Sequence, residues 1–156
     1  MFPLAPEAIR RLNQAGVLVV VVTNQSGVAR GYFPESLVHE VHERMERELA
    51  QGDAHLDALY CCPHGAAARC ACRKPRPGML HRAVEELGVD LQRSFVIGDR
   101  YTDMELAFNG SARAILVKTG YGLGELAWHA QEWPRQPDVV TENLQTAVDW
   151  ILKDTQ

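Results

Sequence analysis

The stretch Val17-Leu18-Val19-Val20-Val21-Val22-Thr23-Asn24-Gln25-Ser26-Gly27 decides the fold class of this sequence. Its first six residues are all apolar, which is typical of a strand covered on both faces in a parallel sheet. The polar residues that follow predict a turn. A helix is predicted before the strand, over residues 6–15, because Pro6 suits a first helical turn and Gly16 ends the pattern.

The alternation of strand and helix continues to the end of the chain. Further strands are predicted over residues 56–61, 94–97, 114–117 and 139–140. Further helices are predicted over residues 34–51, 78–87, 103–108, 125–131 and 143–152. In the helix over 34–51, the residues spaced by four, Leu37, Val41, Met45 and Leu49, are expected to form one apolar stripe. Strands alternating with helices predict one α/β doubly wound (Rossmann-like) domain over residues 1–156, with a parallel sheet. Ligands in such folds bind beyond the carboxyl ends of the strands.

Composition excludes several classes of protein. With 46% hydrophobic and 23% charged residues, the 156-residue chain is ordinary for a globular protein. A net charge of −4 argues against a nucleic-acid partner. No apolar run approaches the roughly 20 residues of a membrane span, and the first residues lack the basic start of a signal peptide. We therefore expect a cytoplasmic monomer with no membrane partner.

Four cysteines lie within 61–72, a spacing that suggests metal binding in a reducing compartment. Three thiolates and one imidazole make the donor set of a closed, structural zinc site. The predicted ligands are Cys62, His64, Cys70 and Cys72. They lie in a zinc loop over residues 61–73. This loop has no hydrophobic core of its own, and a bound metal would compensate for that lack. Cys61 is expected to be a buried thiol. The alternative interpretation of the four predicted ligands is a group of unpaired thiols beside a surface histidine.

Two basic or hydroxyl positions suit phosphate. Thr23 is followed by successive loop amides that can bind phosphate oxygens, although a simple turn would use the same residues. Lys74 lies between Arg73 and Pro75, in a segment that its prolines stiffen. A fixed ammonium group can neutralise a phosphate and a neighbouring carboxylate, and the alternative is a solvated basic loop.

The segment Gly98-Asp99-Arg100-Tyr101-Thr102-Asp103 follows the strand over 94–97. Asp99 and Asp103 can converge on one point, and carboxylate oxygens suit Mg²⁺, which shares its coordination with substrate phosphate. We expect Asp99 to bind the metal. The alternative for Asp103 is a favourable charge at the N-terminus of a helix.

Together these motifs resemble motifs two, three and four of the haloacid-dehalogenase (HAD) superfamily. The closest resemblance is to its heptose-bisphosphate phosphatases, and the related histidinol-phosphate phosphatases share much of the pattern. The matching stretches are Thr23 to Gly31, Cys62-Pro63-His64, Cys70 to Pro75, and Gly98-Asp99 with Asp103-Met104.

The resemblance implies a magnesium-dependent sugar-phosphate phosphatase that removes the C7 phosphate of a heptose bisphosphate. Such a substrate belongs to the synthesis of activated heptose for lipopolysaccharide. Thr23 would bind the transferring phosphoryl group and Lys74 would stabilise its charge. Asp99 would hold Mg²⁺, and Asp103 would orient its surroundings. Candidates for further substrate contacts are Asn24, Arg30 and Arg73.

The family's first strand ends in Asp-x-Asp-Gly, whose first aspartate is the nucleophile, and this sequence contains no Asp-x-Asp. The resemblance places that motif before the helix over 6–15. We therefore expect a chain that is truncated at its N-terminus, lacks the central strand and is inactive as it stands. Two alternatives are a non-catalytic protein that binds phosphate and zinc on the same scaffold, and a zinc-dependent interaction module.

Overall fold

In the computed structural model, residues 3–154 are described, and strands and helices alternate along them. The helices are α1 (Ala5–Gln14), α2 (Glu35–Ala50), α3 (Gly78–Leu87), α4 (Tyr101–Gly110), α5 (Gly122–His129) and α6 (Leu144–Asp154). The strands are β1 (Val20–Asn24), β2 (Ala58–Cys62), β3 (Phe95–Gly98), β4 (Arg113–Val117) and β5 (Val139–Thr141). Short 3₁₀ turns occupy Leu91–Arg93 and Ala130–Glu132. Each predicted helix and strand is therefore present.

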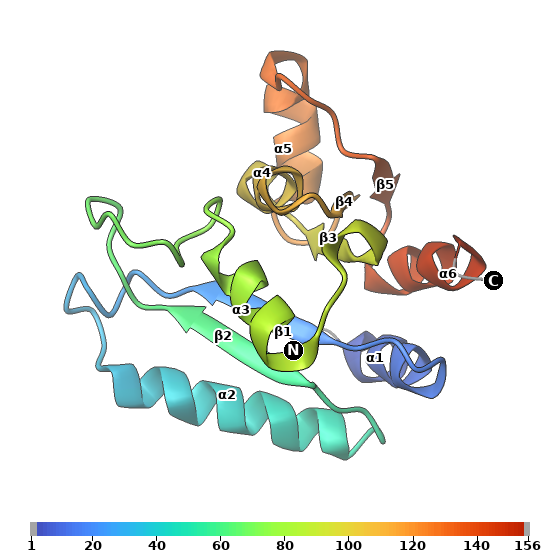
Figure 1. Cartoon of the computed structure of the whole chain (residues 1–156), viewed down its shortest axis with the longest axis horizontal. Helices are drawn as coiled ribbons and strands as arrows, with labels where there is room; N and C mark the ends of the chain where they lie inside the picture. Colours follow the sequence, from blue (N-terminus) through green and yellow to red (C-terminus); the bar gives the residue numbers. More distant parts are fainter. Residues whose placement is uncertain (1–2, 155–156) are drawn as a thin grey trace.

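The strands are parallel and form two sheets, as expected for a fold that lacks its central strand. β1 pairs with β2, and a second sheet has the order β3-β4-β5. Within residues 3–154, no backbone ladder joins β1 to β3. Figure 1 shows the first sheet with α2 beneath it and the second sheet beside α4. The predicted α/β class with parallel strands is confirmed.

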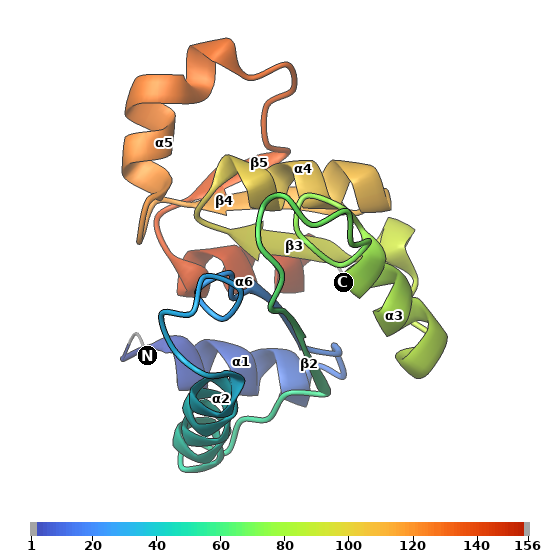
Figure 2. The ribbon, with the colours of Figure 1, turned by 90° about the vertical axis from the view of Figure 1, so that its left-hand side faces the viewer.

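The core of the molecule is built on β4. Leu116 packs with Met104 and Leu106 of α4, whereas Ile115 packs with Val148 of α6 on the opposite face. Alternate residues of a strand point to opposite faces, so a sheet between two helical layers needs an apolar residue at each position. Figure 2 shows β3 and β4 between α4 and α6.

The sequence predicted a strand that begins at Val17, whereas strand β1 begins at Val20. The Val17 N–H donates to the Leu12 carbonyl of α1 at 3.0 Å. At Val19, the Asp57 carboxylate accepts the N–H at 2.7 Å, and the Asp57 N–H donates to the carbonyl at 2.8 Å. The ladder to β2 therefore starts one residue later, at the pair Val20 and Ala58.

The stripe predicted for α2 is wrong in its first half. Leu37 and Val41 are 42% and 57% exposed, whereas Val38 and Leu49 are buried. An α-helix turns about 100° per residue, so positions spaced by four drift around it by about 40° per step. A spacing of four therefore cannot keep one face buried along the whole helix.

Among residues 3–154, no helix combines the length and the apolar character that crossing a membrane requires.

Candidate functional site

Lys74 lies at the centre of the candidate site and bridges the two sheets. Its ammonium Nζ is 2.7 Å from Asp103 Oδ1, and it donates to the Val22 carbonyl of β1 at 3.2 Å. The side chains of Lys74 and Asp103 are only 17% and 10% exposed. The other carboxylate oxygen of Asp103 accepts the Arg100 N–H at the start of α4. Both oxygens of Asp103 are thus engaged by the protein.

Asn24, the last residue of β1, uses its carboxamide on the main chain of Lys74. Asn24 Oδ1 accepts the Lys74 N–H at 3.0 Å, and Asn24 Nδ2 donates to the Lys74 carbonyl at 3.2 Å. Sequence analysis assigned Asn24 to substrate binding, and the structure shows it bound to the neighbouring loop.

Asp99 directly follows β3, where the sequence placed it. Its Oδ2 accepts the Tyr121 N–H at 3.0 Å. Gly120 has a φ of +65°, and a Cβ at this position would overlap the Asp99 carboxylate. The loop after β4 therefore wraps closely around Asp99, and it can do so only because residue 120 is glycine.

The ends of β1 and β3 are joined by a series of contacts. Thr23 is the residue after Val22, and the Val22 carbonyl accepts from Lys74, which pairs with Asp103. Asp103 in turn packs against Gly98, where a Cβ would overlap the aspartate side chain. The ends of β1 and β3 therefore both contact the Lys74–Asp103 ion pair, through Val22 and Gly98. Thr23 itself accepts a hydrogen bond from Gln25 Nε2 at 3.2 Å.

Three arginines near the strand ends bind different partners. Arg73 Nη1 donates to the His64 carbonyl at 3.0 Å, so it ties the cysteine-rich loop to the segment that carries Lys74. The Arg30 guanidinium lies 6.0 Å from the Tyr32 ring centre. Arg100, a further arginine that the sequence places near the strand ends, has its guanidinium 3.7 Å from the ring centre of Tyr121, whose N–H binds Asp99.

The four predicted zinc ligands converge. One ligand atom from each of Cys62, His64, Cys70 and Cys72 lies within 4.8 Å of the others. Cys62 Sγ is 3.7 Å from Cys70 Sγ and 3.1 Å from Cys72 Sγ, and His64 Nδ1 is 3.3 Å from Cys72 Sγ. A tetrahedral zinc with Zn–S bonds of about 2.3 Å separates its sulfur ligands by about 3.8 Å, close to the first of these distances.

The environment of Cys72 disfavours its thiolate when no metal is bound. Burial and the neighbouring Cys62 and Cys70 sulfurs raise the pKa of Cys72 to about 12. A divalent metal reverses that effect because it binds thiolates directly. Cys61 is half-buried, lies outside the cluster and forms no disulfide. Burial raises the pKa of its thiol, although Cys61 is less buried than the sequence predicted.

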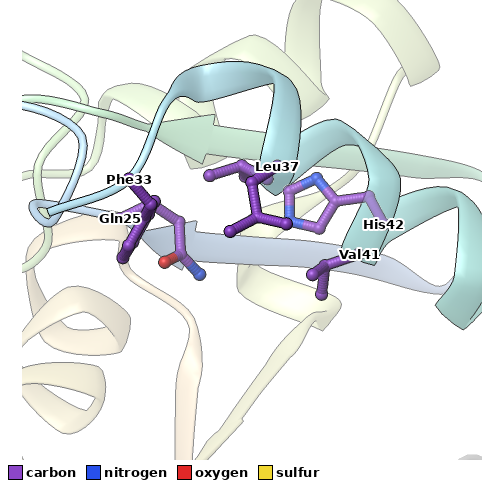
Figure 3. Close-up of a pocket in the computed structure, with 6 residues that line it drawn as sticks. Gln25, Phe33, Leu37, Val41 and His42 are labelled. Atoms are coloured by element: carbon purple, nitrogen blue, oxygen red, sulfur yellow. The ribbon is translucent and has the colours of Figure 1, made fainter.

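A shallow apolar hollow of about 150 Å³ lies between α2 and the loop after β1 (Figure 3). Figure 3 shows Leu37, Val41 and His42 of α2 on one side, with Gln25 and Phe33 of the loop nearby. Neither Asp99 nor Lys74 lines it, so the hollow does not mark the metal site.

A family model and a solved structure identify the class of protein to which the chain is similar. Residues 71–147 match the family model described as HAD-hydrolase-like. A crystal structure of D,D-heptose 1,7-bisphosphate phosphatase from B. bronchiseptica, complexed with magnesium and phosphate, superposes with a TM-score of 0.89 at 38% identity. That alignment covers 98% of this chain and 84% of the other.

Similarity to curated proteins gives the particular family. The D-glycero-beta-D-manno-heptose-1,7-bisphosphate 7-phosphatase of Pseudomonas aeruginosa is 43% identical over 124 residues, which cover 80% of this chain and 70% of that protein. The D-glycero-D-manno-heptose-1,7-bisphosphate 7-phosphatase of Thermosynechococcus vestitus is 41% identical over 162 residues, 97% of this chain and 82% of that protein. The chain belongs to the D-glycero-D-manno-heptose-1,7-bisphosphate 7-phosphatase family.

Proposed function

We propose that this chain carries most of the machinery of a magnesium-dependent sugar-phosphate phosphatase, whose substrate is D-glycero-D-manno-heptose 1,7-bisphosphate and whose reaction removes the C7 phosphate. The observation that carries the proposal is the buried Lys74–Asp103 pair at the carboxyl ends of β1 and β3. An ammonium held there can neutralise phosphate oxygens in a site that excludes much of the water. The names and the bound phosphate of the relatives support the same reaction.

Each residue has a distinct role in the proposal. Thr23 binds the phosphoryl oxygens with its hydroxyl, and Lys74 neutralises the charge that develops during transfer. Asp103 holds the Lys74 ammonium at a fixed position. Arg30 and Arg73 are the proposed contacts for the rest of the substrate.

Asp99 is the proposed magnesium ligand of this chain. Its carboxylate is half-buried, and one oxygen is oriented by the Tyr121 N–H. Oxygen donors of this kind fit Mg²⁺, which would offset phosphate charge when bound. Asp103 fits that role less well, because Lys74 and the Arg100 N–H already engage its two oxygens.

We also propose that the metal of the cysteine-rich loop is zinc, with a structural role. Four protein ligands leave no open coordination position for chemistry. The loop connects to the site through the Arg73–His64 hydrogen bond, so the metal helps to fix the segment that carries Lys74.

The nucleophile is the component that these 156 residues do not offer. They contain no Asp-x-Asp, and β1 and β3 are not paired with each other. We propose that a strand ending in Asp-x-Asp-Gly pairs with both edges and delivers its carboxylates beside Lys74. The 156 residues alone are then expected to bind phosphate without hydrolysing it, which is the alternative function of a phosphate- and zinc-binding protein.

The experiment is to add such a strand at the N-terminus and to measure phosphate release with and without Mg²⁺. We expect activity only in the extended protein with Mg²⁺, and we expect Asp99→Asn to abolish most of it. Asp149→Asn, on the exposed face of α6, is the matched control. Robust turnover by the 156 residues that survives both Asp99→Asn and Lys74→Ala would contradict the proposed chemistry.

Substrate choice is tested in the same extended protein. A bisphosphate presents a second dianion, which guanidinium groups bind well, whereas histidinol phosphate carries a cationic amine. We expect a higher kcat/KM for the heptose bisphosphate and a loss of that preference in Arg73→Ala. A preference for histidinol phosphate would leave only the general phosphatase function.

A further inference from the structure

The segment that carries Lys74 is difficult to fix through its own main chain. It reads Arg73-Lys74-Pro75-Arg76-Pro77, and its two prolines have no N–H to donate. Within the segment, the Arg76 N–H donates to the Arg73 carbonyl at 2.9 Å, which leaves the Lys74 and Pro75 carbonyls to accept from donors on other segments.

Two asparagine side chains supply those donors at consecutive residues. Asn24 Nδ2 donates to the Lys74 carbonyl at 3.2 Å, and Asn109 Nδ2 donates to the Pro75 carbonyl at 2.9 Å. Asn24 also accepts the Lys74 N–H at 3.0 Å. The two asparagines come from different parts of the fold, since Asn24 ends β1 and Asn109 lies in the last turn of α4.

The same two elements also hold the Lys74 side chain. Val22 of β1 and Asp103 of α4 bind its ammonium. Main chain and side chain of Lys74 are thus fixed from the same two sides. The carboxamide of Asn24 uses one donor and one acceptor to bind the main chain of Lys74.

We propose that Asn24 and Asn109 are positioning residues for Lys74, and that the Asn24 side chain acts through Lys74. The pair forms an asparagine clamp, by which we mean the three hydrogen bonds from Asn24 and Asn109 to residues 74 and 75. That Lys74 serves phosphate chemistry rests on the function proposed above. The clamp and its test do not require the chain to be active.

The chain offers a matched control for the clamp. Asn13 makes the same reciprocal pair with His55, donating to its carbonyl at 3.2 Å and accepting its N–H at 3.0 Å. That pair joins the end of α1 to the segment before β2, away from Lys74. Asn13→Ala therefore removes the same kind of hydrogen bonds from a different place.

Lysine labelling reads the position of Lys74 directly, because the sequence has only three lysines, Lys74, Lys118 and Lys153. The intact 156-residue chain is treated briefly with acetic anhydride, and the rate at each lysine is measured by mass spectrometry. We expect Lys74 to react more slowly than Lys153. Asn24→Ala and Asn109→Ala should each accelerate Lys74 by about fivefold or more, the factor for losing one net hydrogen bond.

Asn13→Ala should leave the Lys74 rate unchanged even where it lowers the melting temperature as much. Asn24→Asp tests the mechanism further, because its carboxylate still accepts the Lys74 N–H but cannot donate. We expect amide exchange at Lys74, followed by NMR, to accelerate in Asn24→Ala and to stay slow in Asn24→Asp. Unchanged Lys74 labelling in both alanine variants, or equal acceleration in Asn13→Ala, would overturn the clamp while leaving the proposed phosphatase function untouched.

Discussion

Removing the Asp103 carboxylate should cost far more stability than removing a surface carboxylate. In Asp103→Ala, the Lys74 ammonium keeps the Val22 carbonyl but loses its counter-ion, in a place where the lysine side chain is only 17% exposed. Breaking a buried pair from one side costs about 3–5 kcal/mol, and the remaining exposure places this one near about 3 kcal/mol. For a chain of this size, that corresponds to a fall in melting temperature of about 6–12 °C.

Urea and thermal unfolding, followed by circular dichroism, measure this cost. The control is Glu48→Ala on α2, where the Arg44–Glu48 pair has a similar distance of 2.8 Å but side chains that are 76% and 33% exposed. Exposed pairs of this spacing contribute only about 0.3–0.5 kcal/mol. Asp103→Asn should fall between the two, because its single amide oxygen can still accept from the Lys74 ammonium, while its NH2 group cannot accept the Arg100 N–H.

The double variant Lys74→Met with Asp103→Leu isolates the charge. Replacing both partners by apolar residues leaves no unpaired ion, so most of the lost stability should return. If Asp103→Ala costs no more than Glu48→Ala, or if the double variant is less stable than Asp103→Ala, the pair does not behave as a shielded ion pair and the reasoning fails.

Three further results are expected. Protein expressed with sufficient zinc should contain one zinc ion per chain. Both a chelator and Cys72→Ser should lower its melting temperature, because metal binding is coupled to folding. A zinc content under about a quarter equivalent per chain, measured by elemental analysis, would contradict this. Gly120→Ala should weaken Mn²⁺ binding at Asp99, measured by electron paramagnetic resonance, while zinc content stays constant, because its Cβ meets the Asp99 carboxylate. Burial and the hydrogen bond to Glu86 raise the pKa of Tyr60, so folding disfavours its ionised form; the stability difference between the parent and Tyr60→Phe, measured by urea unfolding, should fall as the pH rises above about 10 and stay constant below it.

Local patterns in the sequence identified the elements and the strand-end residues. The position of Asp99 after β3 could be predicted because the apolar run before it stops at Gly98. This pattern involves only a few consecutive residues. The convergence of the Cys and His side chains around Cys62 could be predicted for the same reason, because two close pairs are separated by a short loop. Both features depend on neighbours in the chain.

The features that could not be predicted depend on contacts between distant segments. Asn109 lies 34 residues from Pro75, whose carbonyl it binds, and nothing in its local sequence marks it. Asn24 has the residue type of a substrate ligand, and only the fold brings it against Lys74. Val41 is 57% exposed whereas Val38 is buried, and the sequence alone did not show which of these apolar residues faces the core.

The separation of the two sheets has a consequence for how the molecule opens. Backbone ladders make each sheet cooperative internally, but between β1 and β3 the described residues are connected through side chains, such as those of Lys74 and the apolar cluster that includes Val19 and Ile97. Side-chain contacts are lost one at a time, whereas a ladder is lost as a unit. Native-state amide exchange should therefore show two levels of protection, one for β1 and β2 and a higher one for β4, which is paired on both sides and covered by helices on both faces.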